Sequence, residues 1–138
     1  MKKKHYTEVD VIKSDKEGFK GMNQRFIWTK SDGCPNFAMR VMEFEPHGHT
    51  SYHSHREEHE FFFIEGEPVF VDANGDETPL KVGDTVYVPS DEPHQIKNVG
   101  DTVMKVICMI PILEGGDGKA PAPREDGQGY VTKRPSGC

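Results

Sequence analysis

The sequence predicts an all-β domain, a sandwich or barrel with few or no helices. No segment of useful length repeats its apolar residues every 3.6 positions, as an amphipathic helix would. Short runs rich in β-branched and aromatic residues recur instead, and Gly, Pro, Asn and Asp separate them. Short strands at this spacing are typical of sandwiches and barrels, which must close or cover their sheet edges.

Seven runs are expected to form strands, and turn residues lie between them. In chain order they are Arg25–Thr29, Phe37–Glu45, His59–Glu65, Val69–Val71, Thr85–Val88, His94–Val99 and Thr102–Leu113. Asn74-Gly75 is a strong signal for a tight turn after the fourth run. The weakly patterned stretch 6–19 could add an edge strand, on this chain or on a neighbouring subunit.

The composition divides the chain into one domain and a tail. Residues 1–114 carry all the strand signals and, in a chain of 138 residues, suffice for a hydrophobic core without disulfides. Residues 115–138 begin Gly-Gly-Asp-Gly and continue with Pro and charge, which predicts a linker-like tail.

Charge and cysteine content limit the partners and the compartment. A net charge of −6 argues against nucleic acid or an anionic membrane as the main partner, and no window could span a membrane. Cys34, Cys108 and Cys138 are an odd number without metal-type spacing, so reduced thiols are expected. No apolar stretch follows Met1-Lys2-Lys3-Lys4, so we expect a soluble, cytoplasmic protein.

Four histidines lie where a barrel could bring them together. His53, His55 and His59 fall within nine residues, and His94 follows about one hairpin later. Side chains two apart in a strand face the same way, so His53 and His55 would face one interior, and His59 could open the next strand facing it. Imidazole binds first-row transition metals well. The cluster predicts a site for one divalent ion, whether Fe, Mn, Ni, Cu or Zn.

Other side chains are expected around this site, although no catalytic residue is assigned. The candidates for the cavity wall, or for contacts behind the ligands, are Met39, Glu60, Phe61, Phe63, Tyr87 and Ile96. Glu57 and Glu58 are expected to be solvated or to hold a ligand imidazole. Arg40 could bind an anionic substrate if it faced the cavity, but a surface position is the default interpretation.

The spacing of the first three histidines resembles the first motif of the cupin superfamily. That motif has His-x-His, three or four residues, Glu, six residues and Gly. Here His53-x-His55 is followed by three residues, His59, six residues and Gly66, so His59 takes the place of the usual glutamate ligand. A shift of one residue would make Glu60 the ligand, but the spacing to Gly66 favours His59.

The second cupin motif is matched as well. It has Gly, five residues, Pro-x-Gly, two residues, His, three residues and Asn. Here Gly83, Pro89, His94 and Asn98 keep that spacing, and Asp91 replaces the middle glycine. The chain also resembles a subgroup of small single-domain cupins with four histidines, which share Pro-Asn-Phe-x-Met-Arg, here Pro35–Arg40. The resemblance covers about residues 9–113 and implies a double-stranded β-helix (jelly-roll) barrel that forms a homodimer.

Three kinds of function remain open. The preferred hypothesis is a metal-dependent oxygenase of the dioxygenase type acting on a small organic molecule, because many small cupins are dioxygenases. The second is redox-neutral isomerase or lyase chemistry, which needs a base in the cavity that the sequence does not clearly provide. The third is a non-catalytic cupin that binds a small ligand. In all three, the partner is a small molecule.

Overall fold

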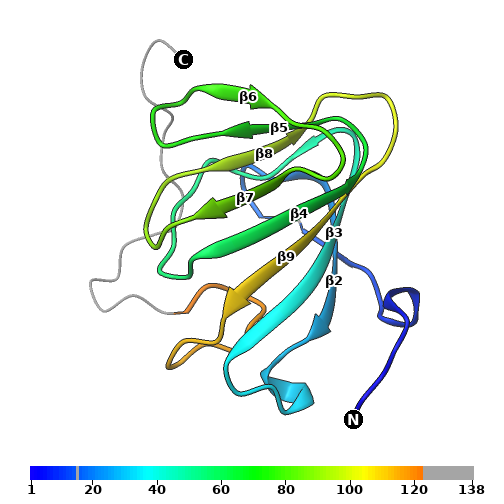
Figure 1. Ribbon diagram of the computed structural model, residues 1–138, viewed down its shortest axis with the longest axis vertical. Coiled ribbons are helices and arrows are strands. Elements are labelled where there is room, and N and C mark those ends of the chain that lie inside the picture. Colours follow the sequence, from blue (N-terminus) through cyan, green and yellow to red (C-terminus); the bar gives the residue numbers. More distant parts are fainter. Residues whose placement is uncertain (15, 123–138) are drawn as a thin grey trace.

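The computed structural model describes residues 1–14 and 16–122, and in this part of the chain nearly all regular structure is strand (Figure 1). Two short 3-10 helices, η1 (Tyr6–Glu8) and η2 (Lys30–Asp32), accompany the strands. The strands are β1 (Ile12–Lys13), β2 (Lys20–Trp28), β3 (Phe37–His49), β4 (His59–Glu65), β5 (Pro68–Val71), β6 (Glu77–Pro79), β7 (Thr85–Val88), β8 (Gln95–Asn98) and β9 (Met104–Pro111).

The strands form a single antiparallel sheet that curls into a half-barrel (Figure 1). The order along the sheet is β6-β5-β8-β3-β9-β4-β7, with β2 beside β3 and β1 beside β2. The long strand β3 connects the parts, because it pairs with β2, β8 and β9. The all-β prediction is confirmed.

The concave face of the sheet forms the core, and the strand register divides it into two ends. At one end Phe44 of β3 lies opposite Met104 of β9, and Phe63 of β4 lies opposite Val106. These four side chains are fully buried. We call them the apolar end. Towards the other end of the same strands, the inward positions include His59 on β4 and Arg40 on β3, which is where the candidate site lies.

Two positions in the motifs have conformations that explain their residue types. Gly66 has φ +94°, and a Cβ there would lie 2.7 Å from the Met104 Cα, so only glycine fits without a shift. Asp91 replaces a motif glycine and has φ +64°, a left-handed conformation that Asp tolerates better than most residues. Its N–H donates to the His55 carbonyl at 2.8 Å, which ties this turn to the histidine loop.

All seven predicted strands are present, and five of them have different ends. The bounds of β4 and β7 are as predicted, whereas β2 and β3 are longer than the sequence patterns indicated. β6 was not predicted, and β1 pairs with β2 of the same chain. Cys34 and Cys108 are free thiols; Cys138 lies outside the described residues. Within those residues no helix is both long and apolar enough to cross a membrane.

The first residues of the predicted tail lie against the barrel. Gly116, Gly118 and Ala122 are buried, and the Lys30 N–H donates to the Asp117 carbonyl at 3.2 Å. We call residues 114–122 the C-terminal strap. Residues 123–138 of the predicted tail lie outside the described part of the chain.

Candidate metal centre

The four predicted histidines come together on the concave side of the sheet, from a loop and two strand ends. His53 and His55 lie in the loop between β3 and β4, His59 is the first residue of β4, and His94 directly precedes β8. His53 and His94 form an isolated β-bridge, with N–H to carbonyl distances of 3.0 and 2.9 Å. His53 and His55 face one interior as predicted, but strand alternation is not the cause, because the loop between β3 and β4 is not a strand.

Hydrogen bonds to backbone carbonyls orient three of the rings instead. The Nδ1 atoms of His53, His55 and His94 lie 2.8, 2.8 and 2.9 Å from carbonyl oxygens two residues away. A carbonyl only accepts, so Nδ1 must carry the proton in each ring. In a neutral imidazole this leaves the Nε2 lone pair free, as metal ligation requires.

The ligand atoms of these three histidines lie within 4.8 Å of one another. The fourth ring joins them through His59 Nε2, which is 2.5 Å from His55 Nε2. His94 Nε2 is buried and has no hydrogen-bond partner in the described structure. A buried, unpaired nitrogen beside other imidazole nitrogens is unfavourable unless something binds it, and this donor set suits a first-row divalent ion.

The environment keeps these imidazoles neutral. Burial lowers the pKa of His53 and of His55 to about 3 and that of His94 to about 4. Burial also lowers the pKa of His59 well below its usual value. The Arg40 guanidinium lowers the pKa of all four further. Near neutral pH all four rings are therefore neutral, and in His53, His55 and His94, whose Nδ1 atoms carry the proton, the Nε2 lone pair is free.

His59 differs from the other three in its second contact. Its Nδ1 lies 3.0 Å from the Sγ of Cys108, a fully buried thiol on β9. His59 thus contacts a sulfur atom on an inward position of β9, whereas the other three rings contact backbone carbonyls.

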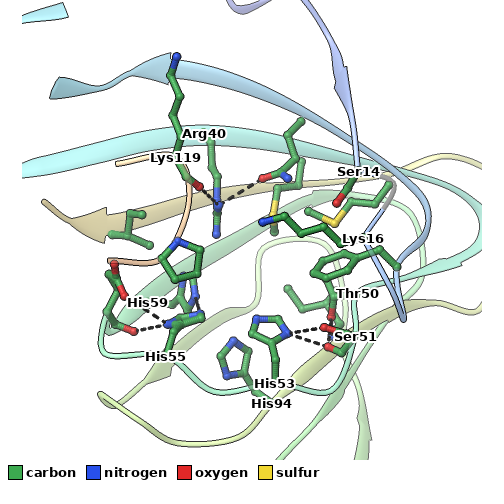
Figure 2. Close-up of a pocket in the computed structure, with 18 of the residues that line it drawn as sticks. Ser14, Lys16, Arg40, Thr50, Ser51, His53, His55, His59, His94 and Lys119 are labelled. Carbon is green, nitrogen blue, oxygen red and sulfur yellow. Dashed lines mark hydrogen bonds and ion pairs between the residues drawn. The ribbon is translucent and has the colours of Figure 1, made fainter. Parts of the chain in front are cut away.

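The histidines line a cavity of about 170 Å³ that opens to solvent (Figure 2). This is similar in size to an engineered cavity that holds benzene, of about 150 Å³. Its apolar wall consists of Phe19, Met22, Met42, Phe61, Ile96, Ile110 and Pro121. Its other lining residues besides the histidines are Ser14, Lys16, Glu17, Gln24, Arg40, Thr50, Ser51, Glu57 and Lys119.

The predicted wall residues divide into two groups. Phe61 and Ile96 line the cavity, and Phe63 lies deeper, in the core. Met39, Glu60 and Tyr87 do not line it, which corrects the prediction for these three.

Strand alternation and neighbouring groups explain the correction. Glu60 alternates with the inward His59 and Phe61, so it is exposed on the outer face opposite Tyr87. The Tyr87 hydroxyl donates to the Glu58 carboxylate at 2.6 Å. Met39 lines a separate surface depression beside Trp28.

Two charged residues of the cavity differ from expectation. Arg40 was expected on the surface, but it shares an inward orientation with Ala38 and Met42 on β3. Glu57 is only 3% exposed, so it is not solvated. Its Oε2 accepts a 2.6 Å hydrogen bond from the Ala122 N–H of the C-terminal strap, and its Oε1 is buried without a partner in the described structure. Strand parity could have indicated Arg40, whereas no local signal predicts the burial of Glu57.

The Cupin domain family profile matches residues 40–110, which is just over half of the chain. The chain therefore belongs to the cupin family. The matched region holds all four histidines and Glu57.

Individual relatives have several different names. An oxalate-binding protein of Thermotoga maritima is 37% identical over 73 residues, which are 52% of this chain and 60% of that protein. A protein named polyketide synthase CurC of Streptomyces cyaneus is 26% identical over 129 residues, covering 88% of this chain and 84% of that one. The solved structure of the polyketide cyclase RemF of Streptomyces resistomycificus superposes with a TM-score of 0.75 at 27% identity, over 80% of this chain and 79% of that one.

Proposed function

We propose that this cupin is a metal-dependent enzyme that performs redox-neutral chemistry on a carbonyl group of a small organic molecule. Enolisation followed by isomerisation or ring closure is the kind of reaction meant. The observation that carries the proposal is Glu57, a residue in the wall of the cavity that the four histidines line, whose buried carboxylate has one oxygen without a hydrogen-bond partner among the described residues. This is the base that the redox-neutral hypothesis lacked.

In this proposal His53, His55, His59 and His94 would hold one divalent ion. When bound, the ion would supply a Lewis acid that polarises a carbonyl oxygen and so acidifies the adjacent C–H. Four neutral ligands leave the full charge of the ion unneutralised, which suits that role. The Nδ1 hydrogen bonds of His53, His55 and His94 keep these three rings in the ligating tautomer before any ion arrives.

Glu57 is suited to move the proton. The strap N–H of Ala122 holds Oε2, which fixes the carboxylate and leaves Oε1 to accept a proton from the substrate carbon. The same residue orients His55, because its carbonyl accepts from His55 Nδ1 and its Oε1 is 4.0 Å from that atom. The proposed base, Glu57, is thus in direct contact with His55, one of the proposed metal ligands.

The apolar wall has a separate role. Phe61, Ile96 and Ile110 line the same cavity as the imidazoles and, once a substrate fills it, would limit the access of water to the reacting carbon. Exclusion of water lowers the local dielectric constant, so the charges that act on the developing enolate act more strongly. The name of RemF as a polyketide cyclase, and that of CurC as a polyketide synthase, support carbonyl chemistry of this type.

A second candidate function is the oxygenase predicted from the sequence. The absence of a carboxylate among the four candidate ligands favours it, since neutral ligands stabilise the lower oxidation state of a redox-active ion. It requires Fe, Mn, Cu or Ni and does not require Glu57.

One experiment separates the two functions. The metal-loaded protein is incubated in D2O with a panel of aromatic ketones and 2-oxo acids, and α-proton exchange is followed by NMR while an electrode records oxygen. We expect metal-dependent exchange without oxygen uptake, and a decrease of about 100-fold or more in Glu57→Gln. Glu58→Gln is the matched control, because Glu58 is exposed. Oxygen uptake without exchange, unaffected by Glu57→Gln, would favour the oxygenase.

A further inference from the structure

Arg40 occupies a position in the barrel that apolar residues normally take. It alternates with the buried Ala38 and Met42 on β3, and its register partner on β9 is the fully buried Cys108. Figure 2 shows its side chain reaching from the strand towards the imidazoles. A half-buried guanidinium on the inward face of a sheet needs a specific reason, because moving a charge out of water is costly.

The groups around Arg40 do not neutralise it. Its Nη1 donates to Gln24 Oε1 at 3.2 Å and to the Lys119 carbonyl at 3.4 Å, which are both uncharged acceptors. Within residues 1–14 and 16–122, its buried Nε has no hydrogen-bond partner and none of the ion pairs involves Arg40. The Cys108 thiol, which also interacts with the guanidinium, is a neutral and weak acceptor. Among the described residues, the guanidinium therefore has a buried donor that no charged group meets.

The charges of the cavity favour an anion there. Its lining contains the cations Lys16, Arg40 and Lys119 and the anions Glu17 and Glu57, so it is positive although the whole chain carries −6. A divalent ion on the four neutral histidines would add to this positive charge. The cavity lining thus carries a net positive charge, whereas the whole chain is negative.

We propose that Arg40 determines substrate specificity by binding an anionic oxygen, a carboxylate or an ionised enol or phenol. The cavity would then take a small, largely apolar ring or chain that bears an acidic group, with the apolar part against Phe19, Met42 and Ile110. Charge-assisted hydrogen bonds from a planar guanidinium suit such oxygens well. The substrate class rests on the proposed function, but anion binding can be measured without any turnover.

The test is the preference of the protein for benzoate over benzamide, which have the same shape and differ in charge. Calorimetry on the protein as purified should show that benzoate binds about 10- to 100-fold more tightly. Arg40→Gln should bring the ratio close to one. Arg40→Lys keeps the charge without the planar fork and should retain only part of the preference.

Two controls separate this role from others. Lys119→Ala removes one positive charge from the same cavity but keeps the backbone carbonyl that Arg40 contacts, so the preference should persist. If Arg40 only held the C-terminal strap, its replacement would weaken benzoate and benzamide equally. Failure of wild-type protein to bind benzoate, an unchanged ratio in Arg40→Gln, or an equal loss in Lys119→Ala would overturn the proposal.

The metal content of the same samples keeps this proposal apart from the proposed function. Arg40→Gln should retain the wild-type metal content. If wild-type protein showed the Arg40-dependent preference but neither bound metal nor catalysed exchange, the anion site would stand and the proposed reaction would fail. If wild-type protein catalysed the exchange but did not prefer benzoate, the proposed reaction would stand and the anion site would fail.

Discussion

The two ends of the concave face are built on the same strands from different kinds of residue. At the apolar end, Phe44, Phe63, Met104 and Val106 are fully buried against one another. At the site end, β3 and β4 instead direct Arg40 and His59 inwards, and Glu57 is buried in the loop before β4. The apolar end gains stability from every buried group, whereas the site end buries polar atoms that lack partners. The apolar burial at one end of the barrel thus offsets the cost of burying polar atoms at the other.

Acid should destabilise the site end most, and this is the largest effect expected. The pKa values of the four histidines lie below 6.5 in the folded chain, so the unfolded chain binds more protons. The stabilisation that depends on neutral histidines is therefore fully present above about pH 6.5 and is lost as the pH falls towards 3. Each histidine can contribute up to about 1.4 kcal/mol per pH unit.

Urea unfolding of the metal-free protein between pH 7 and 4 measures this loss. His94→Gln should reduce the slope, because one titrating group is removed from the site end. A free energy of unfolding that stayed constant over this range would contradict the neutral, buried state of the histidines.

Truncation at the apolar end should cost stability without changing the site directly. Phe63→Ala should lower the free energy of unfolding by about 3–5 kcal/mol, since it leaves a cavity among fully buried side chains. Phe62→Ala is a matched control on the adjacent residue of β4, because Phe62 is 47% exposed on the outer face. Its cost should be less than about 1 kcal/mol. Equal costs for the two variants would contradict the assignment of the faces.

The two ends also differ in how far the sequence predicts them. Alternation along 59–63 correctly indicates inward His59, Phe61 and Phe63, because β4 is a regular strand with a buried face. His53 and His55 also face one interior, but this rule does not explain it, because carbonyl contacts in a loop hold their rings. Their convergence was predicted by motif spacing rather than by strand geometry.

The residues that sequence reasoning missed depend on distant contacts. Glu57 is buried because Ala122, 65 positions later, returns to donate to it, and no local pattern indicates that contact. The parity of Arg40 was visible, but Met39 and Val41 flank it with apolar side chains on the opposite face, so alternation did not distinguish the two faces. Val41 on that opposite face is itself only 6% exposed.

The metal content of purified variants, measured by elemental analysis per folded chain, tests the proposed ligand set. We expect about one divalent transition metal ion in wild-type protein and its loss in His94→Ala and His59→Ala. His47→Ala and Glu60→Ala should keep the ion, because both side chains are exposed and lie outside the cavity. Retention of the ion in His94→Ala, or its loss in Glu60→Ala with retention in His59→Ala, would contradict the proposed ligand set.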